Sequence, residues 1–301
     1  MKYWVHVHNT EVEQLLDIAR MAEELGFEGI VDGDHWATPL EIKSKYPYSV
    51  DGSVPSGLEW SFPDNCVAAA AVAAVTTRLK YGSSVYIIAN RNNPIQVAKS
   101  VGTASILSGD RFIFGVAGGW MKDEYDLAGI DWSTRTRRME EMIEVCRKLW
   151  GPGPVEHHGE FFDFPPIFVE PSPRRKVPIW IGGHAPAALR RCGRLADGCM
   201  GSHALPEQIP GMVQAINEGR AEAPDERRKA EFPIMISPNL AKGENAEAMR
   251  GAYTRDMYKQ MEDWGVTDTF IGPLPWAVGK KRSTLEEKRR LLEDFANTHI
   301  R

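Results

Sequence analysis

Residues 109–120 read GDRFIFGVAGGW, and this stretch decides how the chain is expected to fold. Its apolar part, residues 112–116, has the composition of a buried strand and runs directly into two glycines. Glycines at the end of a strand allow backbone angles closed to other residues and a close approach to a ligand. Residues 177–184, VPIWIGGH, repeat the pattern. Two such strand ends predict a cofactor bound across the carboxyl ends of neighbouring parallel strands.

The rest of the chain alternates between strand and helix patterns. Residues 11–25 place apolar side chains at helical spacing and end at Gly26. The eight predicted strands are residues 3–8, 27–32, 80–88, 111–116, 177–181, 198–202, 232–237 and 267–271. Eight strands separated by helices predict one α/β domain over residues 1–301, a TIM (β/α)8 barrel. A doubly wound sheet is the alternative, but its GxGxxG turn does not follow the first strand.

Two irregular segments interrupt this alternation. Residues 36–63 contain four prolines together with several glycines and aromatic residues. A long irregular loop inside a compact domain is usually a lid or a binding element. Residues 151–176 carry clusters of proline and a predicted hairpin around residues 158–164. We expect both insertions on the same rim, at the carboxyl-terminal face of the barrel.

Composition narrows the classes of function. Hydrophobic residues make up 43% and charged residues 26% of the chain, which is typical of folded globular enzymes. The net charge of −5, with no long basic run, argues against nucleic acid or an anionic membrane as a partner. Four cysteines without a CxxC pair indicate reduced thiols. With no charged leader and no membrane-spanning apolar run, we expect a cytoplasmic enzyme with a small-molecule substrate.

Several short motifs occur in an order that carries more information than any one of them. They are LGFEGI at 25–30 leading into GDHW at 33–36, AAVTTRLKYGSSV at 73–85, NPIQVAK at 93–99, LSGDR at 107–111, GGW at 118–120, PIWIGG at 178–183 and ADG at 196–198. In this order and spacing they resemble the bacterial luciferase-like monooxygenase superfamily. The resemblance covers residues 1–202 densely. It implies a TIM barrel, commonly a homodimer, that binds a flavin or deazaflavin at the carboxyl ends of its strands.

The pair Asp34-His35 resembles the branch of that family that uses coenzyme F420, an 8-hydroxy-5-deazaflavin. Members that use FMN often show Glu-His-His at this place, so an FMN-dependent monooxygenase is the alternative. A carboxylate beside an imidazole can hold its tautomer and place a proton donor or acceptor near the hydride-accepting ring. We therefore expect hydride transfer between the deazaflavin C5 and a small organic substrate, with His35 and Asp34 catalytic. The simpler reading is that Asp34 caps the next segment and His35 packs under the loop.

The resemblance also assigns contacts with the cofactor. It implies a non-proline cis peptide between Ser84 and Val85, backing the ring. The backbone-mediated contacts would come from Ala117, Gly118, Gly119, Gly182, Gly183 and His184, and the helix that follows residue 185 favours an anion. The alternative for both glycine pairs is simple turn geometry. The run Arg174-Arg175-Lys176 is either a contact for the anionic cofactor tail or a solvated surface.

Substrate contacts and the second proton-transfer group are less well defined. Similar deazaflavin enzymes can carry a glutamate just after the glycine turn, whereas this chain has Trp120 there. The acid role is then expected to fall to His35 or His8, with Glu124 next in order. Trp36 and Trp120 are predicted to line an apolar substrate cavity together with His8.

Two rival classes of function remain, and His6 and His8 suggest one of them. They alternate on the first strand and face the same way, as the ligands of a metal-dependent TIM-barrel hydrolase do. His184, His203 and Asp268 would be the further ligands, but the set is incomplete and the glycine turns go unexplained. We expect no metal, with His6 packed in the barrel and His8 lining the substrate pocket. The other class is a non-catalytic protein that binds a flavin-like molecule.

Overall fold

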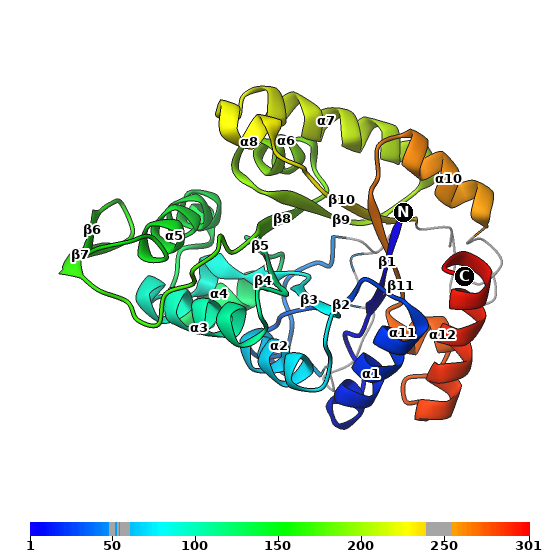
Figure 1. Cartoon of the computed structure of the whole chain (residues 1–301). Helices are drawn as coiled ribbons and strands as arrows, with labels where there is room; N and C mark the ends of the chain where they lie inside the picture. The colour runs from blue at the N-terminus through cyan, green and yellow to red at the C-terminus, as the bar shows by residue number, and fades with distance from the viewer. Residues whose placement is uncertain (48–51, 53, 55–60, 239–253) are drawn as a thin grey trace.

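A closed barrel of parallel strands forms the centre of the molecule (Figure 1). The computed structural model describes residues 1–47, 52, 54, 61–238 and 254–301. The strands, in the order in which they pair around the barrel, are β3 (Lys80–Ser83), β2 (Gly29–Asp32), β1 (Lys2–His6), β11 (Asp268–Ile271), β10 (Ile234–Pro238), β9 (Gly198–Ala204), β8 (Ile179–Gly183), β5 (Phe112–Ala117) and β4 (Tyr86–Ile87). A further pairing of β3 with β5 closes the barrel. All eight predicted strands are present, the third being divided into β3 and β4.

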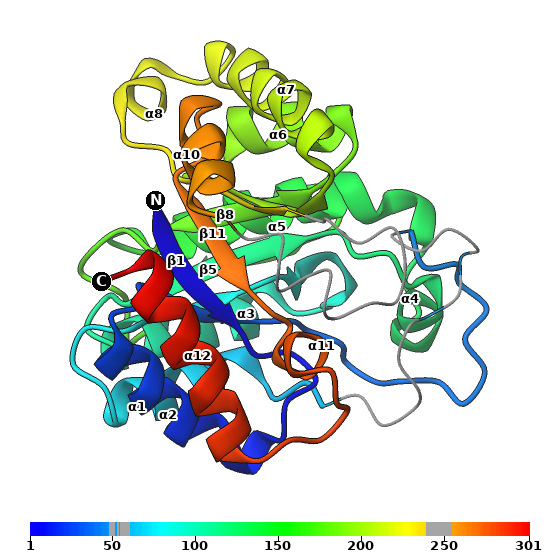
Figure 2. The same ribbon diagram turned by 90° about the vertical axis from the view of Figure 1, so that its right-hand side faces the viewer.

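Helices surround the barrel in both views (Figures 1 and 2). The longer ones are α1 (Leu15–Leu25), α2 (Asn65–Ala74), α3 (Pro94–Leu107), α5 (Arg135–Leu149), α6 (Pro186–Leu195), α7 (Ile209–Ala221), α10 (Arg255–Asp263) and α12 (Leu285–His299). Shorter helices are α4 (Lys122–Ala128), α8 (Asp225–Lys229) and α11 (Leu274–Val278), with 3-10 turns η1 (Val12–Gln14), η2 (Ile88–Asn90), η3 (Trp132–Thr134) and η4 (Pro206–Gln208). The predicted end of α1 is confirmed, because Gly26 follows it in the left-handed conformation, with φ +93°.

The inside of the barrel is filled by large side chains at its amino-terminal end. They are Trp4, Val31, Ile113, Trp180, Met200, Met235 and Phe270. Two of the barrel glycines make room for the indoles, since a Cβ on Gly29 would lie 2.3 Å from Trp4 and one on Gly198 would lie 2.6 Å from Trp180. The Trp4 indole donates to Asp268 Oδ1 over 2.8 Å. These side chains pack the inside of the barrel.

The second insertion does not lie where we expected it. Residues 151–176 do contain the predicted hairpin, with β6 (Val155–His158) antiparallel to β7 (Asp163–Ile167). However, the insertion follows a helix and precedes a strand, so it lies at the amino-terminal end of the barrel. Arg175 Nε is 3.6 Å from Asp110, just before β5, and Lys176 Nζ is 2.5 Å from Asp197, just before β9. The prediction that both insertions share one rim is therefore wrong. Of the two interpretations of residues 174–176, the solvated surface fits the exposed side chains of Arg175 and Lys176.

The two ends of the chain close the barrel together. β1 pairs with both β2 and β11, and α1 lies beside α12 (Figure 2). The fully buried Lys288 Nζ of α12 donates to Glu11 Oε2 at 2.7 Å and to Gln14 Oε1 at 2.6 Å, just before α1. All four cysteines are free and buried. No helix among the described residues combines the length and the apolar character needed to cross a membrane.

Candidate active site

A cavity of about 690 Å³ opens at the carboxyl ends of the barrel strands. The predicted site residues that line it are His8, Asp34, His35, Ser84, Val85, Ala117, Gly118, Gly119, Trp120, Gly182, Gly183 and His184. The first insertion also reaches it, through Lys45, Tyr46 and Phe62. Trp36 does not line the cavity. Its side chain is 52% exposed and lies under the Arg91 guanidinium, 5.3 Å from the ring centre, so the prediction of Trp36 as a pocket wall is wrong.

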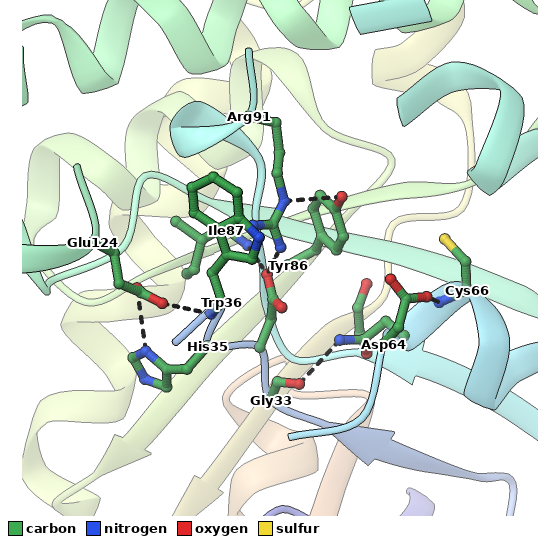
Figure 3. Close-up of polar contacts among 12 residues, drawn as sticks. Gly33, His35, Trp36, Asp64, Cys66, Tyr86, Ile87, Arg91 and Glu124 are labelled. Atoms are coloured by element: carbon green, nitrogen blue, oxygen red, sulfur yellow. Dashed lines mark hydrogen bonds and ion pairs between the residues drawn. The ribbon is translucent and has the colours of Figure 1, made fainter. Parts of the chain in front are cut away.

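Asp34 is held by the backbone and by an arginine rather than by His35. Its Oδ2 accepts hydrogen bonds from Ile87 N at 2.9 Å and from Arg91 Nη2 at 2.8 Å (Figure 3). Burial raises the pKa of Asp34, and the positive charge of Arg91 opposes that rise only in part. Arg91 is itself fixed, because its Nε donates to the Tyr86 hydroxyl over 3.0 Å. Asp34 thus ties the end of β2 to β4.

The carboxylate that orients His35 is that of Glu124. His35 Nδ1 lies 3.2 Å from Glu124 Oε2, and Glu124 Oε1 accepts from Trp36 N at 2.5 Å (Figure 3). Glu124 is 1% exposed and comes from the first turn of α4. A carboxylate at Nδ1 favours the tautomer with its hydrogen on that atom, which leaves Nε2 for proton transfer. The expectation that Asp34 serves as this partner is therefore corrected to Glu124.

Aromatic rings surround His35 on the cavity side. The Trp120 ring lies 5.6 Å from the His35 ring and the Phe62 ring 4.9 Å from it, both edge-on, measured between centroids. Tyr46 packs edge-on against Trp120 at 5.1 Å. These side chains come from the loop after β2, from the turn after β5 and from the first insertion. They place an imidazole of defined tautomer in an apolar wall of the cavity.

His6 and His8 bond to each other. His8 Nδ1 lies 3.0 Å from His6 Nε2, and the two rings meet edge-on. Asp268, the carboxylate that the hydrolase alternative requires, pairs in register with Lys2 at the opposite end of β1. It also accepts the hydrogen bond from Trp4, so it is remote from His6. The side chain of His203 lies outside the described residues.

The glycine turns form a cradle that packs too closely against Val85 and Ile87 to carry side chains. A Cβ on Gly182 would lie 2.7 Å from Val85, and one on Gly119 would lie 2.9 Å from Ile87. Gly119 also has φ +72°, which side chains rarely tolerate. The peptide bond between Ser84 and Val85 is cis, as the resemblance implies. A flat ring could therefore lie against Val85 between the two glycine turns, so these residues fit a flavin-like cofactor.

Cationic groups and a helix start also line the cavity. Arg135 and Arg191 contribute there, together with Thr136 and the residues that precede α6. Arg135 lies over the Trp132 ring at 4.0 Å, and Arg191 Nε donates to Glu140 over 2.7 Å. Burial lowers the pKa of His184, so the neutral imidazole predominates near neutral pH. Sequence reasoning missed both arginines, because each lies in a helix whose pattern indicates an ordinary amphipathic element.

The sequence profile of the luciferase-like monooxygenase family matches residues 2–297. The chain belongs to this family. Across 292 residues it is 34% identical to an uncharacterized protein of Mycobacterium tuberculosis strain H37Rv, covering 97% of this chain and 96% of that protein. Across 289 residues it is 27% identical to an F420-dependent glucose-6-phosphate dehydrogenase of Amycolatopsis mediterranei, covering 93% and 77% respectively.

A solved structure supports the fold of this luciferase-like protein. An F420-dependent secondary alcohol dehydrogenase, solved with an F420-acetone adduct, superposes with a TM-score of 0.73. The superposition covers 99% of this chain and 97% of that one, at 17% sequence identity. At that identity the likeness shows the TIM barrel alone, in agreement with the closed strand order described above.

Proposed function

We propose that this luciferase-like protein is an F420-dependent oxidoreductase that transfers a hydride between the deazaflavin and a small organic substrate. The observation that carries the proposal is His35, held by Glu124 at the edge of a glycine-lined cradle. The family and the F420-dependent relative of Amycolatopsis mediterranei support it. When bound, the deazaflavin supplies a hydride donor or acceptor at C5 without readily activating oxygen.

The residues of this chain would bind the cofactor, exchange a proton with it and exclude water. Backbone at Gly118, Gly119, Gly182 and Gly183 would hold the ring against Val85, and Arg135 would face the anionic part of the cofactor. His35 would exchange a proton at Nε2 beside the ring, while Glu124 keeps Nδ1 protonated. Trp120 and Phe62 would keep water away from that proton.

FMN is the competing cofactor. The arginines and the helix start that line the cavity would suit the FMN phosphate as well as the phosphate of F420. An FMN-dependent monooxygenase is therefore the second candidate function. The Glu124-held histidine favours F420, because hydride chemistry needs a proton donor or acceptor of fixed tautomer next to the ring.

Titration of the purified protein with F420 and with FMN, followed by tryptophan fluorescence, tests the proposal. We expect tight binding of F420, weaker binding of FMN, and turnover of F420 with members of a panel of secondary alcohols and sugar phosphates. Gly182→Val should abolish F420 binding while the circular dichroism spectrum stays native, because the new side chain fills the cradle beside Val85. Binding of FMN without any response to F420 would contradict the assignment, and binding without turnover would favour a non-catalytic role.

We also infer that the protein acts as a homodimer through α2. Residues 65–74 contain no charged side chain, although this helix lies on the surface. Its outward residues are Val67, Ala70, Ala71 and Ala74, and Val67 is 68% exposed. An apolar outer helix face of this kind is typical of a protein–protein contact.

A further inference from the structure

His6, the last residue of β1, and His8, just after it, form a hydrogen-bonded pair that has no role in the proposed function so far. His6 is buried at the end of β1, with its ring edge-on to Phe270 at 4.8 Å, and His8 lines the cavity. His8 Nδ1 and His6 Nε2 are 3.0 Å apart. We propose that His8 is a second proton-transfer residue of this site, and that His6 is the positioning residue that accepts its charge. This inference rests on the proposed F420-dependent function.

A hydrogen bond between two imidazole nitrogens holds one hydrogen between them. When His8 Nδ1 donates, His8 Nε2 carries a lone pair and acts as a base. When that hydrogen moves to His6 Nε2, His8 Nε2 can hold a proton while the ring stays neutral. The pair can therefore present either a base or an acid at His8 Nε2. When His8 holds the extra proton there, the positive charge lies on the His6 ring.

Hydride transfer to F420 requires two proton exchanges at different places. In the oxidation of an alcohol, a bound deazaflavin would accept a hydride at C5 from the substrate C–H bond and would also need one proton. The substrate O–H bond would break as its C=O bond forms, so the oxygen would have to give up a proton to a base. His35 is assigned to the ring, so the substrate oxygen needs another group. His8 fits this role because it and His35 flank the same Phe62 ring, at 5.8 and 4.9 Å between centroids.

Apolar rings and several titratable groups surround the pair. The rings that pack against it from other elements, Phe270 and Phe62, are apolar. The charged and titratable groups that line the same cavity are Asp34, His35, Lys45, Tyr46, Arg135, His184 and Arg191. Asp34 is already neutralised by Arg91, and Arg191 by Glu140. The His6–His8 bond is a defined polar contact that helps to orient His8.

Nuclear magnetic resonance of the full-length protein tests the pair without any ligand. Histidine labelled with nitrogen-15 reports the tautomer of each ring and its protonation across a pH series. We expect His6 and His8 to take up one proton together, and His6→Gln to turn His8 into an independently titrating ring. His158→Gln, on the exposed hairpin, is the matched control. Independent titration of His6 and His8 in the wild-type protein would overturn the shared proton.

Turnover then tests the role of His8. With F420 and an alcohol that the panel identifies, His8→Asn should lower kcat roughly 10²-fold or more while KM changes little. His6→Gln should shift the pH profile of kcat, and His158→Gln should behave as wild type. Normal kcat in His8→Asn would overturn this proposal and leave the F420 assignment standing. Failure to bind F420 would overturn the proposed function and the role of His8 with it.

Discussion

At the scale of single residues, the environment of Glu124 decides what His35 can do. Its two carboxylate oxygens are both engaged, one by His35 Nδ1 and one by Trp36 N, and the side chain has almost no contact with solvent. A carboxylate placed this way fixes which nitrogen of the imidazole carries the hydrogen. The chemistry at His35 Nε2 therefore depends on a residue that does not itself line the cavity.

Glu124→Gln should lower kcat roughly 10²-fold, because an amide can donate to Nδ1 and reverse the tautomer of His35. F420 affinity should change little, since Glu124 does not line the cavity. Steady-state rates across a pH series, together with fluorescence titration, measure both quantities. Asp126→Asn, an exposed change on the same helix α4, is the control. A variant with wild-type kcat would show that the Glu124 contact is only structural.

Asp32 predicts a pH-dependent stability. This carboxyl is almost fully buried and accepts a hydrogen bond from Gly33 N at 2.8 Å. Burial raises its pKa well above the usual value, and the nearby charge of Asp34 adds to the rise. The folded protein therefore holds this proton more tightly than the unfolded chain does. The stabilising contribution is complete below the unfolded pKa of about 3.9 and is lost as pH rises through the folded pKa.

Asp32→Asn should then raise the melting temperature at about pH 8 and have a smaller effect at about pH 5. The amide oxygen can still accept from Gly33 N, but the side chain cannot ionise. Thermal unfolding at the two pH values measures the difference. An equal change in melting temperature at both would mean that Asp32 does not titrate differently in the folded state.

The sequence could predict which residues reach the site, but not how they pair there. His8, Asp34, Ser84 and Gly182 follow parallel strands, and the carboxyl ends of such strands meet at one face. The partner of His35 lies 89 residues away, on a helix whose position depends on packing. The position of Trp36 next to His35 in the sequence predicts a place in the cavity wall. That prediction fails because a side chain next to a cavity residue can point away from the cavity.

At the scale of elements, the start of α2 fixes the turn after β2, which carries Asp34. Asn65 in its first turn is fully buried, and its Nδ2 donates to Gly33 O over 3.0 Å. Its Oδ1 accepts from the Tyr81 hydroxyl of β3 at 3.2 Å. The helix begins there because Asp64 accepts from Cys66 N and Val67 N, each at 2.9 Å. The start of α2 thus couples the turn after β2 to β3.

Asn65→Ala should lower the free energy of unfolding by about 1–3 kcal/mol, because Gly33 O and the Tyr81 hydroxyl lose a buried partner. It should also weaken F420 binding, since the turn that carries Asp34 loses its anchor. Asp64→Ala is the matched comparison. It removes only the helix cap, at about 1 kcal/mol, and should leave F420 affinity unchanged. Urea unfolding and fluorescence titration separate the two effects, and equal F420 affinities in both variants would disprove the coupling.

The order of elements in the chain predicts the rim on which the second insertion lies, whereas the composition of the insertion does not. Its hairpin could be predicted from prolines and aromatic residues. The prediction of the carboxyl-terminal rim for it is wrong, because it lies at the amino-terminal end of the barrel. Residues 151–176 follow the helix at 135–149, and a helix in a barrel returns the chain to the amino ends of the strands. The direction of the preceding element, rather than the composition of the loop, decides the rim.

At the scale of the whole molecule, the exposed face of α2 predicts association. Val67→Glu should convert a dimer into a monomer, because a charge would be buried at the centre of an apolar contact. Sedimentation velocity at several protein concentrations measures this. A glutamate at Phe168, which is equally exposed but lies just after the hairpin, should leave the dimer intact. A wild-type protein that sediments as a monomer would refute the interface.

The closure of the barrel between its first and last strands constrains how the protein is made. β1 gains its partner β11 only when residue 271 is available, and Lys288 fastens the last helix to residues before α1 later still. During synthesis, β1 therefore has one unpaired hydrogen-bonding edge until β11 is made. An unpaired strand edge can pair with the wrong strand. The cavity requires the completed ring, so we expect a ligand bound there to stabilise the finished barrel and not the growing chain.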